Sequence, residues 1–452
     1  MTLLNELSAE VCQRARMSRD PRFDGRFFVA VKTTGIFCLP ICPANLPKEE
    51  NVEYFSSQAL AVSAGYRPCL RCRPESAPHS WAWKGAETTF LRALTLIEQG
   101  ELDGSLETLA SRLGISDRYL RQLFQRHLGM PPKQYAQIQQ LMFAKQLLHT
   151  SQISITEVAY ASGFQSTRRF NDAFQKLFRL TPTQVRRERA ALPSRNHLSL
   201  AFRGPFDWAH MLDFYRLRAI EGMELVDEQS YQRHFVLGEG TGWFKASMAQ
   251  SHLDIEFEME RLSDLRHLVA RLRRMFDLDA DLISIEAYLE QVAPGLVRRT
   301  GIRIPGVWNA WEAGVRAVLG QQVSVKAAIG QLNLLVSTLA ASEGSTRYFP
   351  TPEQVQMSDL SFLRMPERRK ETLKRLADYV RLHPMDSPMA WLSLSGIGPW
   401  TIDYAQLRGE SRSHCFLTGD LIVRKALAKF PQLTAESVAP WGSYATFHCW
   451  SH

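Results

Sequence analysis

The sequence predicts a multidomain α+β protein that is mostly helical. Its 452 residues exceed what one hydrophobic core normally organises, and two to four domains are expected. Residues 198–257 alternate apolar and polar side chains as half-buried strands do, whereas the periodicity from residue 262 onward is helical. We expect a small α/β domain at 1–80, a double helix-turn-helix domain at 85–190, a strand-rich α+β domain at 197–285 and a helical domain at 286–452.

The composition is that of a globular protein, with 45% hydrophobic and 22% charged residues. A formal net charge of +8 favours an anionic partner, with nucleic acid first. We find no apolar run of membrane-spanning length and no N-terminal signal pattern. Because most of the seven cysteines lie at metal-ligand spacing, we expect a reduced, cytoplasmic protein rather than a disulfide-stapled secreted one.

Four cysteines form two close pairs near the start of the chain, in the sequences G-I-F-C-L-P-I-C and R-P-C-L-R-C. Two such pairs on two turns can converge on one tetrahedral ion, and thiolate is a ligand that zinc prefers. We therefore predict one Zn(II) per chain. By spacing alone a purely structural site is favoured, since closed four-thiolate sites are mostly structural. The predicted ligands are Cys38, Cys42, Cys69 and Cys72.

Residues 18–76 resemble the N-terminal domain of the Ada family of DNA methyl-damage response proteins. The resemblance lies in R-D-P-R-F-D-G-R-F-F-V-A-V-K-T-T-G-I-F-C, E-N-V-E-Y-F and A-G-Y-R-P-C-L-R-C-R-P. It implies that Cys38 is also a reagent, which takes a methyl group from a methylated DNA phosphate and keeps it. Four thiolates on Zn(II) have a net charge near −2, so methylation would remove one negative charge and lower the repulsion from DNA. The resemblance thus implies a DNA-affinity switch.

An internal repeat lies within residues 105–190. One copy reads L-E-T-L-A-S-R-L-G-I-S-D-R-Y-L-R-Q-L-F-Q-R and the other I-T-E-V-A-Y-A-S-G-F-Q-S-T-R-R-F-N-D-A-F-Q-K. Each copy has the order helix, glycine turn, serine N-cap and helix, with Ser116 and Ser166 as the caps. Residues 135–148 are expected to form the helix that joins them. This arrangement resembles the AraC-type DNA-binding domain, in which each second helix enters a major groove.

Polar side chains on the two second helices are candidates for base or phosphate contacts, because Arg, Gln and Asn suit both. For any single residue, a solvated surface position is an equal alternative. The candidates are Arg118, Arg121, Gln122, Arg168, Arg169 and Asn171. The apolar positions of the same helices are interpreted as core: Leu120, Leu123, Phe124, Phe170, Phe174 and Phe178.

The segment L-S-G-I-G-P-W-T-I-D-Y at 394–404 resembles the hairpin of the helix-hairpin-helix DNA glycosylases. Gly396 and Gly398 permit positive φ and are expected to let backbone N–H groups come close to a DNA phosphate. Residues 197–452 resemble the AlkA family of alkylated-base glycosylases through R-G-P-F-D-W, P-G-V-W-N-A-W-E-A-G-V-R-A-V-L-G-Q-Q-V-S-V and W-G-S-Y-A-T-F-H-C-W. The family aspartate corresponds to Asp420.

This second resemblance implies the chemistry of the site. Asp420 would stabilise the sugar cation that forms as the glycosidic bond breaks, or activate water, although a helix N-cap is the alternative role. Gln322 corresponds to the side chain that fills the gap left by an extruded base. A lysine at the position of Trp400 would allow strand cleavage, so tryptophan predicts a monofunctional enzyme. The aromatic base-pocket candidates, each with core packing as its alternative, are Trp400, Tyr404 and Trp450.

Taken together, the sequence predicts an alkylation-repair glycosylase of the 3-methyladenine type, fused to a zinc-thiolate methyl acceptor and a transcription activator. The expected partners are double-stranded DNA with damaged bases, methylated phosphates or promoter sites, and RNA polymerase. The chain is expected to be a monomer. We find no P-C-H-R methyl-acceptor motif after residue 190. The alternative function is a transcription regulator whose glycosylase half is vestigial.

Overall fold

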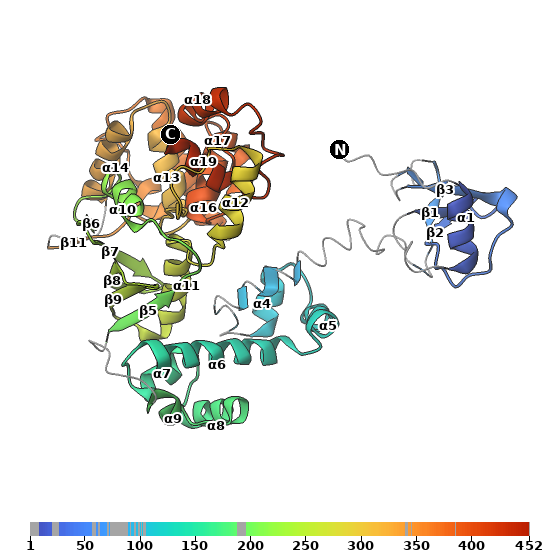
Figure 1. The fold of residues 1–452 in the computed structure, drawn as a ribbon, viewed down its shortest axis with the longest axis horizontal. Helices are drawn as coiled ribbons and strands as arrows, with labels where there is room; N and C mark the ends of the chain where they lie inside the picture. The colour runs from blue at the N-terminus through green and yellow to red at the C-terminus, as the bar shows by residue number, and fades with distance from the viewer. Residues whose placement is uncertain are drawn as a thin grey trace. The chain divides into compact units, whose positions relative to one another are not determined.

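The structure is a computed structural model in which the chain divides into two compact units, Met1–Gln139 and Gln140–His452 (Figure 1). In the described part, no helix is long and apolar enough to cross a membrane. The structure describes residues 9–19, 27–56, 60–61, 64–69, 72, 89–90, 92–94, 96–97, 100, 102, 105–187, 196–339, 342–344, 346–384 and 386–451.

The N-terminal part of the first unit is a small α/β domain, as predicted. Its sheet has the order β3-β1-β2-β4, in which β2 and β4 are parallel and the other neighbours antiparallel. Side chains alternate along β1, so that Phe28 and Ala30 enter one apolar cluster while Val29 enters another with Cys12. The elements are α1 (Ala9–Ser18), β1 (Phe28–Val31), β2 (Ile36–Cys38), η2 (Glu49–Asn51), β3 (Val52–Phe55) and β4 (Arg67–Pro68).

Two helix-turn-helix motifs follow, one in each unit. The serine hydroxyls of Ser116 and Ser166 accept backbone N–H bonds at the starts of α5 and α8, so the predicted N-caps are confirmed. Gly114 and Gly163 have φ of +68° and +84°, the left-handed conformation that each turn requires. The elements are α4 (Leu106–Arg112), α5 (Asp117–Leu128), α6 (Pro132–Thr150), α7 (Ile155–Ala161), α8 (Thr167–Phe178) and α9 (Pro182–Arg187).

An antiparallel five-stranded sheet of order β5-β9-β8-β7-β6 confirms the strand-rich segment. The turn between β7 and β8 is limited to Gly238 and Glu239. The following residues begin β8, where Gly242 packs so closely that a Cβ would lie 2.4 Å from the Glu258 carbonyl oxygen. The elements are β5 (His197–Ala201), α10 (Trp208–Arg216), β6 (Glu224–Val226), β7 (Ser230–Leu237), β8 (Gly240–Met248) and β9 (His252–Met259).

The remainder is helical, apart from a short hairpin of β10 and β11 that the periodicity did not predict. Helix α13 lies at its centre and packs against α14, α16 and α17. The elements are η4 (Leu262–Asp264), α11 (Leu265–Met275), α12 (Leu282–Val292), α13 (Ala310–Gly320), α14 (Val325–Leu339), β10 (Ser342–Glu343), β11 (Thr346–Arg347), α15 (Pro352–Met357), α16 (Glu367–Leu382), η5 (Pro388–Ser393), α17 (Pro399–Gly409), α18 (Leu421–Lys429) and α19 (Gly442–Trp450).

A buried network of four charges links α13 to the sheet. Arg233 of β7 pairs with Glu224 of β6 at 2.9 Å and with Glu312 of α13 at 2.5 Å. Arg316, one turn further along α13, pairs with the same two carboxylates at 3.2 and 2.8 Å. Two positive and two negative groups satisfy one another, which is the condition for keeping charges in a core. The network holds Arg316 in place at the wall of a cavity described below.

Candidate functional sites

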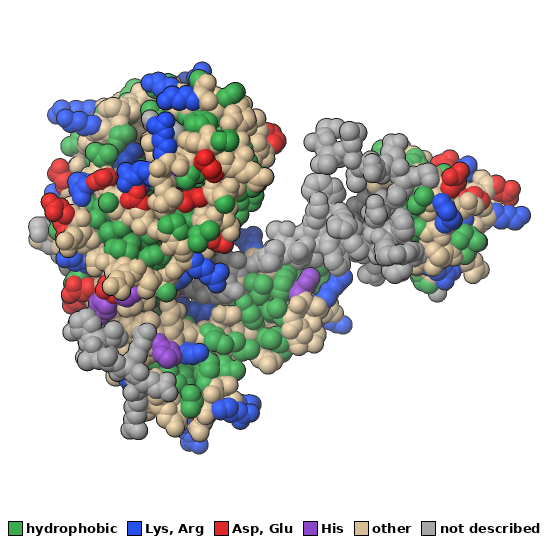
Figure 2. All heavy atoms as spheres, in the orientation of Figure 1, with side chains coloured by type: hydrophobic (Ala, Val, Ile, Leu, Met, Phe, Trp, Pro, Cys, Tyr) green, Lys and Arg blue, Asp and Glu red, His purple; other side chains and the backbone are tan. Residues whose placement is uncertain are grey.

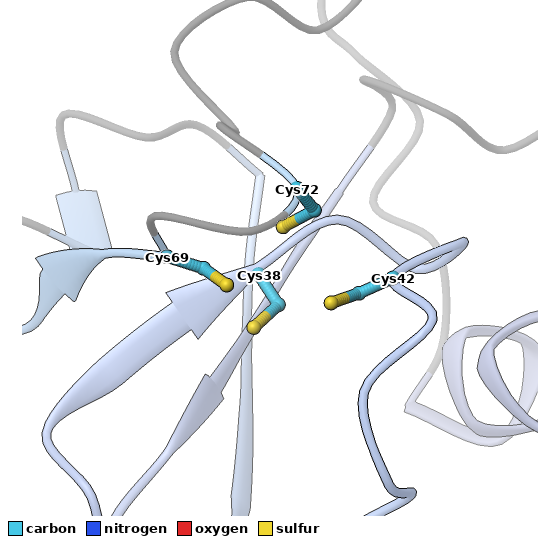
Figure 3. A group of neighbouring side chains, drawn as sticks. All are labelled: Cys38, Cys42, Cys69 and Cys72. Atoms are coloured by element: carbon cyan, nitrogen blue, oxygen red, sulfur yellow. The ribbon is translucent and has the colours of Figure 1, made fainter.

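The four predicted cysteine ligands converge in one cluster (Figure 3). Cys38 is the last residue of β2, Cys42 lies in the turn that follows, and Cys69 and Cys72 come after β4. All four Sγ atoms lie within 4.8 Å of one another. The other cysteines, Cys12, Cys415 and Cys449, are each 2% exposed or less and lie in apolar cores.

The cluster fits a tetrahedral zinc ion. Zn–S bonds of about 2.3 Å place the sulfurs of a tetrahedron about 3.8 Å apart, well within the observed spacing. Hydrogen bonding from the Cys38 thiol lowers the pKa of Cys72 to about 6, whereas the hydrogen bond to Cys72 and burial raise the pKa of Cys38. The backbone N–H of Leu39 also donates to the Cys72 sulfur at 3.4 Å. Cys38, Cys69 and Cys72 are partly exposed, whereas Cys42 is buried.

The predicted DNA-contact residues of both helix-turn-helix motifs are exposed, and the core assignments hold. Arg121 is engaged in an ion pair with Asp117 at 3.5 Å. In the space-filling view, basic side chains project from the surface near α8, beside apolar and other polar side chains (Figure 2). Phe178 is partly buried and the other five predicted core residues are buried. The exposed candidates are Arg118, Arg121, Gln122, Arg168, Arg169 and Asn171.

A cavity of about 490 Å³ lies in the second unit, between α10, α13, α14, α17, α18 and α19. All three predicted pocket aromatics, Trp400, Tyr404 and Trp450, line it together with Asp420. A groove of about 1010 Å³ includes the hairpin glycines and Gln322, and it shares Asp420 and Trp400 with the cavity. The predicted residues of the C-terminal half therefore meet where a surface groove joins an aromatic pocket.

Asp420 is the N-cap of α18, and it is also a wall residue of the cavity. Its Oδ1 accepts the backbone N–H groups of Ile422 at 2.9 Å and Val423 at 3.1 Å, and the indole N–H of Trp450 at 3.0 Å. Among the described residues no hydrogen bond reaches Oδ2. The N-cap alternative is thus correct in structure, but it uses one oxygen and leaves the other for a ligand.

Aromatic rings form the remaining walls. Trp400 and Tyr404, one turn apart on α17, stack with their centroids 5.3 Å apart. Trp450 lies nearly parallel to Phe214 at 6.3 Å. Burial alone would raise the pKa of Tyr404, but nearby guanidiniums, first that of Arg408, lower it overall. The pocket can stack a planar ring, and its lining also includes two arginines and two carboxylates, those of Asp213 and Asp420.

The hairpin and the Gln322 loop are tied together. The side chain of Gln321 donates to the Gly396 carbonyl at 3.1 Å and to Thr401 Oγ1 at 3.2 Å. Gln322 itself has φ of +55°, which is strained for a residue with a Cβ and typical of functional loop tips. Gly396 has φ of +93°, a left-handed conformation that glycine permits, whereas Gly398 does not adopt a positive φ.

Gly398 has φ of −113° and ψ of 177° because it is the extended N-cap of α17. Nothing lies within 4 Å of the place where its Cβ would be. The missing side chain of Gly398 therefore leaves open space next to the N–H groups at the start of α17, and Gly398 does not form a left-handed turn.

Several cavity residues were not predicted. His210, Asp213, Phe214 and Arg218 line the pocket from α10 and the turn after it. Their segment was noticed through the R-G-P-F-D-W motif, but only as evidence of family. The sequence shows a helical stretch here, but which of its side chains face the cavity depends on how α10 packs in the folded core.

Three family models match the chain. The model described as the metal binding domain of Ada matches residues 11–75, a helix-turn-helix domain matches 109–188, and the AlkA N-terminal domain matches 197–309. The first of these, together with the sulfur cluster, confirms the predicted metal site.

Three curated relatives cover different parts of the chain. It is 34% identical to a Mycobacterium tuberculosis protein named probable bifunctional transcriptional activator/DNA repair enzyme AlkA, over 98% of this chain and 96% of that protein. It is 32% identical to DNA-3-methyladenine glycosylase 2 of Escherichia coli, over 56% of this chain and 96% of the relative. The bifunctional transcriptional activator/DNA repair enzyme Ada of Escherichia coli is 34% identical over 38% of this chain and 47% of the relative. The predicted combination of parts is confirmed, and the chain belongs to the family of bifunctional transcriptional activator/DNA repair enzymes of the AlkA type.

Proposed function

We propose that the C-terminal half is a monofunctional DNA glycosylase that extrudes an alkylated base into the aromatic cavity and excises it with Asp420. The observation that supports this most directly is the position of Asp420, whose carboxylate lies where the hairpin groove meets the cavity. A duplex in the groove would present its backbone to the hairpin and an extruded base to the pocket. The deoxyribose between them would then lie beside the carboxylate.

The chemistry follows from the charges. As the N-glycosidic bond breaks, positive charge builds on the sugar, and the free Oδ2 of Asp420 stabilises it or accepts a proton from attacking water. The electron pair of the broken bond leaves with the base. An alkylated purine is already cationic and leaves as a neutral molecule, so little protonation is needed. Trp400 offers no amine for a Schiff base, which excludes that route to strand cleavage at this position.

Two loops assist the extrusion in this proposal. Gln322, held in a strained conformation at a loop tip, enters the space that the extruded base leaves. Gly396 and Gly398 bring the backbone close to a phosphate, with the N–H groups at the start of α17 as donors. Because Gln321 links the two loops, both should move as one piece.

Base release from methylated DNA tests the proposal. The full-length protein should release 3-methyladenine in a single-turnover assay, and Asp420→Asn should lower the rate at least about a hundredfold. Asparagine is an equally good N-cap, so this variant removes charge while leaving α18 capped. Asp403→Asn, on the neighbouring helix but outside the cavity lining, is the matched control and should keep its activity. A wild-type protein that binds methylated DNA without releasing bases would favour the vestigial alternative.

We further propose that Cys38 accepts a methyl group from a DNA methylphosphotriester. Its sulfur attacks the methyl carbon, the C–O bond to the phosphate breaks, and the electron pair returns to the phosphate as a diester anion. A zinc ion held by Cys38, Cys42, Cys69 and Cys72 would keep the sulfurs deprotonated at neutral pH. Transfer of labelled methyl groups should be abolished in Cys38→Ala and unaffected in Cys12→Ala. Loss in the Cys12 variant alone would overturn the assignment, and zinc retention without any methyl transfer would make the site structural.

For the regulatory half we propose that α5 and α8 read promoter DNA, and that methylation of Cys38 raises the affinity of the protein for that DNA. The whole chain would act as a cytoplasmic monomer that contacts RNA polymerase at its target promoters. Footprinting with and without prior methylation measures the switch. Equal affinity in both states would remove the switch from the proposal and leave the repair activities intact.

A further inference from the structure

We propose that the second helix-turn-helix motif is part of the DNA-binding surface of the glycosylase, so that α8 and the hairpin groove hold one and the same duplex during base release. The inference rests on the glycosylase function proposed above and adds a DNA-anchoring site to it. Anchoring needs only phosphate contacts, and it is therefore compatible with sequence-specific reading by the same helix at a promoter.

The apolar core of the second unit does not stop at the end of α9. A single cluster of buried side chains contains residues of the second motif together with residues of the strand-rich domain. Ile153, Val158 and Phe170 from the motif are fully buried in it, and so are Leu200 and Leu265 from the strand-rich domain. The motif and the glycosylase half therefore exclude water from one common core.

Helix α7 and the short helix η4 are in contact across this core. Ile155 of α7 and Leu262 of η4 are both partly buried and pack against the cluster. From η4 the chain continues directly into α11, where Leu265, Leu268 and Leu272 are fully buried. The second motif is thus fastened to a helix that is itself fixed in the core of the glycosylase half.

Only one face of α8 is used in this packing. Phe170 and Phe174 are fully buried in the shared core, whereas Arg168, Arg169 and Asn171 of the same helix are exposed. The two arginines and the asparagine suit phosphate and base contacts. Packing against the glycosylase half therefore leaves the DNA-binding face of α8 open.

The hairpin groove has basic residues of its own. Arg368 and Arg369, at the start of α16, line it together with the hairpin glycines. Two phosphate-binding surfaces that are fixed in one body act as a bivalent ligand, because contact at one surface raises the effective concentration of DNA at the other. A compact unit of about 300 residues is about 50 Å across, a distance of about 15 base pairs. A longer duplex can therefore reach both surfaces.

Base release from duplexes of two lengths tests the proposal. Each duplex carries one 7-methylguanine at its centre, and the lengths are about 40 and about 12 base pairs, above and below the size of the unit. For the full-length protein we measure K1/2, the protein concentration that gives half of the maximal single-turnover rate, together with the maximal rate. The ratio of K1/2 on the short duplex to K1/2 on the long one reports the anchoring.

In the wild type this ratio should be at least about ten, because a second surface adds avidity on the long duplex. Arg168→Ala/Arg169→Ala should lower the ratio at least about fivefold by weakening the anchor. Leu262→Asp places a charge at the contact between α7 and η4, outside α8 and outside the groove, and should lower it as well. The matched control is Leu225→Asp, which should keep the wild-type ratio because Leu225 is 62% exposed and lies outside the shared core, the cavity and the groove.

A second measurement examines the shared core without substituting any of its residues. A protease site inserted between residues 187 and 196 allows the chain to be cut between the second motif and the strand-rich domain of the full-length protein. If the two parts share one core, the two pieces should elute together in gel filtration. The cut protein should also keep the length ratio of the uncut protein within about twofold, since the core rather than the peptide connection holds α8 in place.

Two results would overturn the inference: a length ratio that Arg168→Ala/Arg169→Ala leaves within twofold of the wild type, or pieces that separate after cleavage. Neither affects the proposed glycosylase as long as Asp420→Asn abolishes base release. A wild-type protein that releases no base from either duplex would instead refute the glycosylase proposal. The dissociation constants of the same two duplexes, measured by fluorescence anisotropy, would then still decide whether α8 and the hairpin groove hold one duplex.

Discussion

Asp420 has two roles in the structure, and substitution can separate them. One oxygen caps α18 through two backbone N–H groups, while the other is free to face a substrate. Asparagine keeps a carbonyl oxygen for the cap and replaces the free oxygen with an amide. Alanine removes both. Asp420→Asn and Asp420→Ala should therefore be alike in catalysis and different in the stability of α18.

The size of the stability difference follows from the cap. Replacing a capping Asp with Ala usually costs about 0.5–2 kcal/mol, whereas Asn is nearly as good as Asp. Val423, whose N–H is one of the two donors, is fully buried, so water cannot easily replace the lost acceptor. We expect the upper half of that range, about 1–2 kcal/mol. Local opening of α18 would then increase by a factor of about 5–30.

Hydrogen exchange measured by mass spectrometry on a peptide covering 421–429 gives this number directly, because local openings set exchange rates. In Asp420→Ala the amides of α18 should exchange about 5–30 times faster than in the wild type, and in Asp420→Asn within about threefold of it. Both variants should lack base release. Equally fast exchange in both variants would refute the capping geometry, and retained activity in the asparagine variant would refute the need for charge.

Three further predictions concern other parts of the chain. Gly396→Ala should lower the free energy of unfolding, measured by urea titration, by about 1–3 kcal/mol, because Gly396 has φ of +93° and the new Cβ would lie 2.1 Å from a threonine hydroxyl of α16. Gly398→Ala places its Cβ in open space and should lower the free energy of unfolding by less than about 1 kcal/mol in the same titration. Burial raises the pKa of Asp277 to about 7. The folded state holds a proton on Asp277 that the unfolded state releases, so this group stabilises the fold at low pH and the stabilisation is lost as pH rises through that value. Asp277→Asn should therefore become more stable relative to wild type between pH 5 and pH 8. A difference in free energy of unfolding between the two proteins that does not change with pH would contradict this. Arg168→Ala should weaken binding to an undamaged duplex and reduce the slope of log K against log salt by about 1, while Lys176→Ala, at the other end of α8, should leave the slope unchanged.

Much of the fold follows from local sequence signals. The serine caps and glycine turns of the repeat determine where α5 and α8 begin, because an N-cap and a left-handed residue depend on side chains within a few positions. The alternation of residues 198–257 likewise predicted the five-stranded sheet. The hairpin of β10 and β11 was missed because each strand has two residues, too few for any periodicity.

The sites divide in the same way. Cys38 and its three partners were predictable because ligand spacing along the chain restricts where the sulfurs can go. The φ of Gly398 was not predictable, because glycine is compatible with both a left-handed turn and an extended N-cap. The conformation depends on how α17 begins. Arg218 was missed for a different reason. It lines the cavity, and which side chains after α10 reach the cavity depends on how that helix packs in the folded core.

The buried network also forms part of the pocket, because Arg316 lines the cavity. Glu224 and Glu312 each pair with both Arg233 and Arg316, one from the sheet and one from α13. If Arg233 were removed, Arg316 alone would remain to balance two buried carboxylates, at a cost of about 3–5 kcal/mol in stability. The position of Arg316 in the cavity wall therefore depends on a charge balance that involves the sheet, although none of its strands lines the cavity.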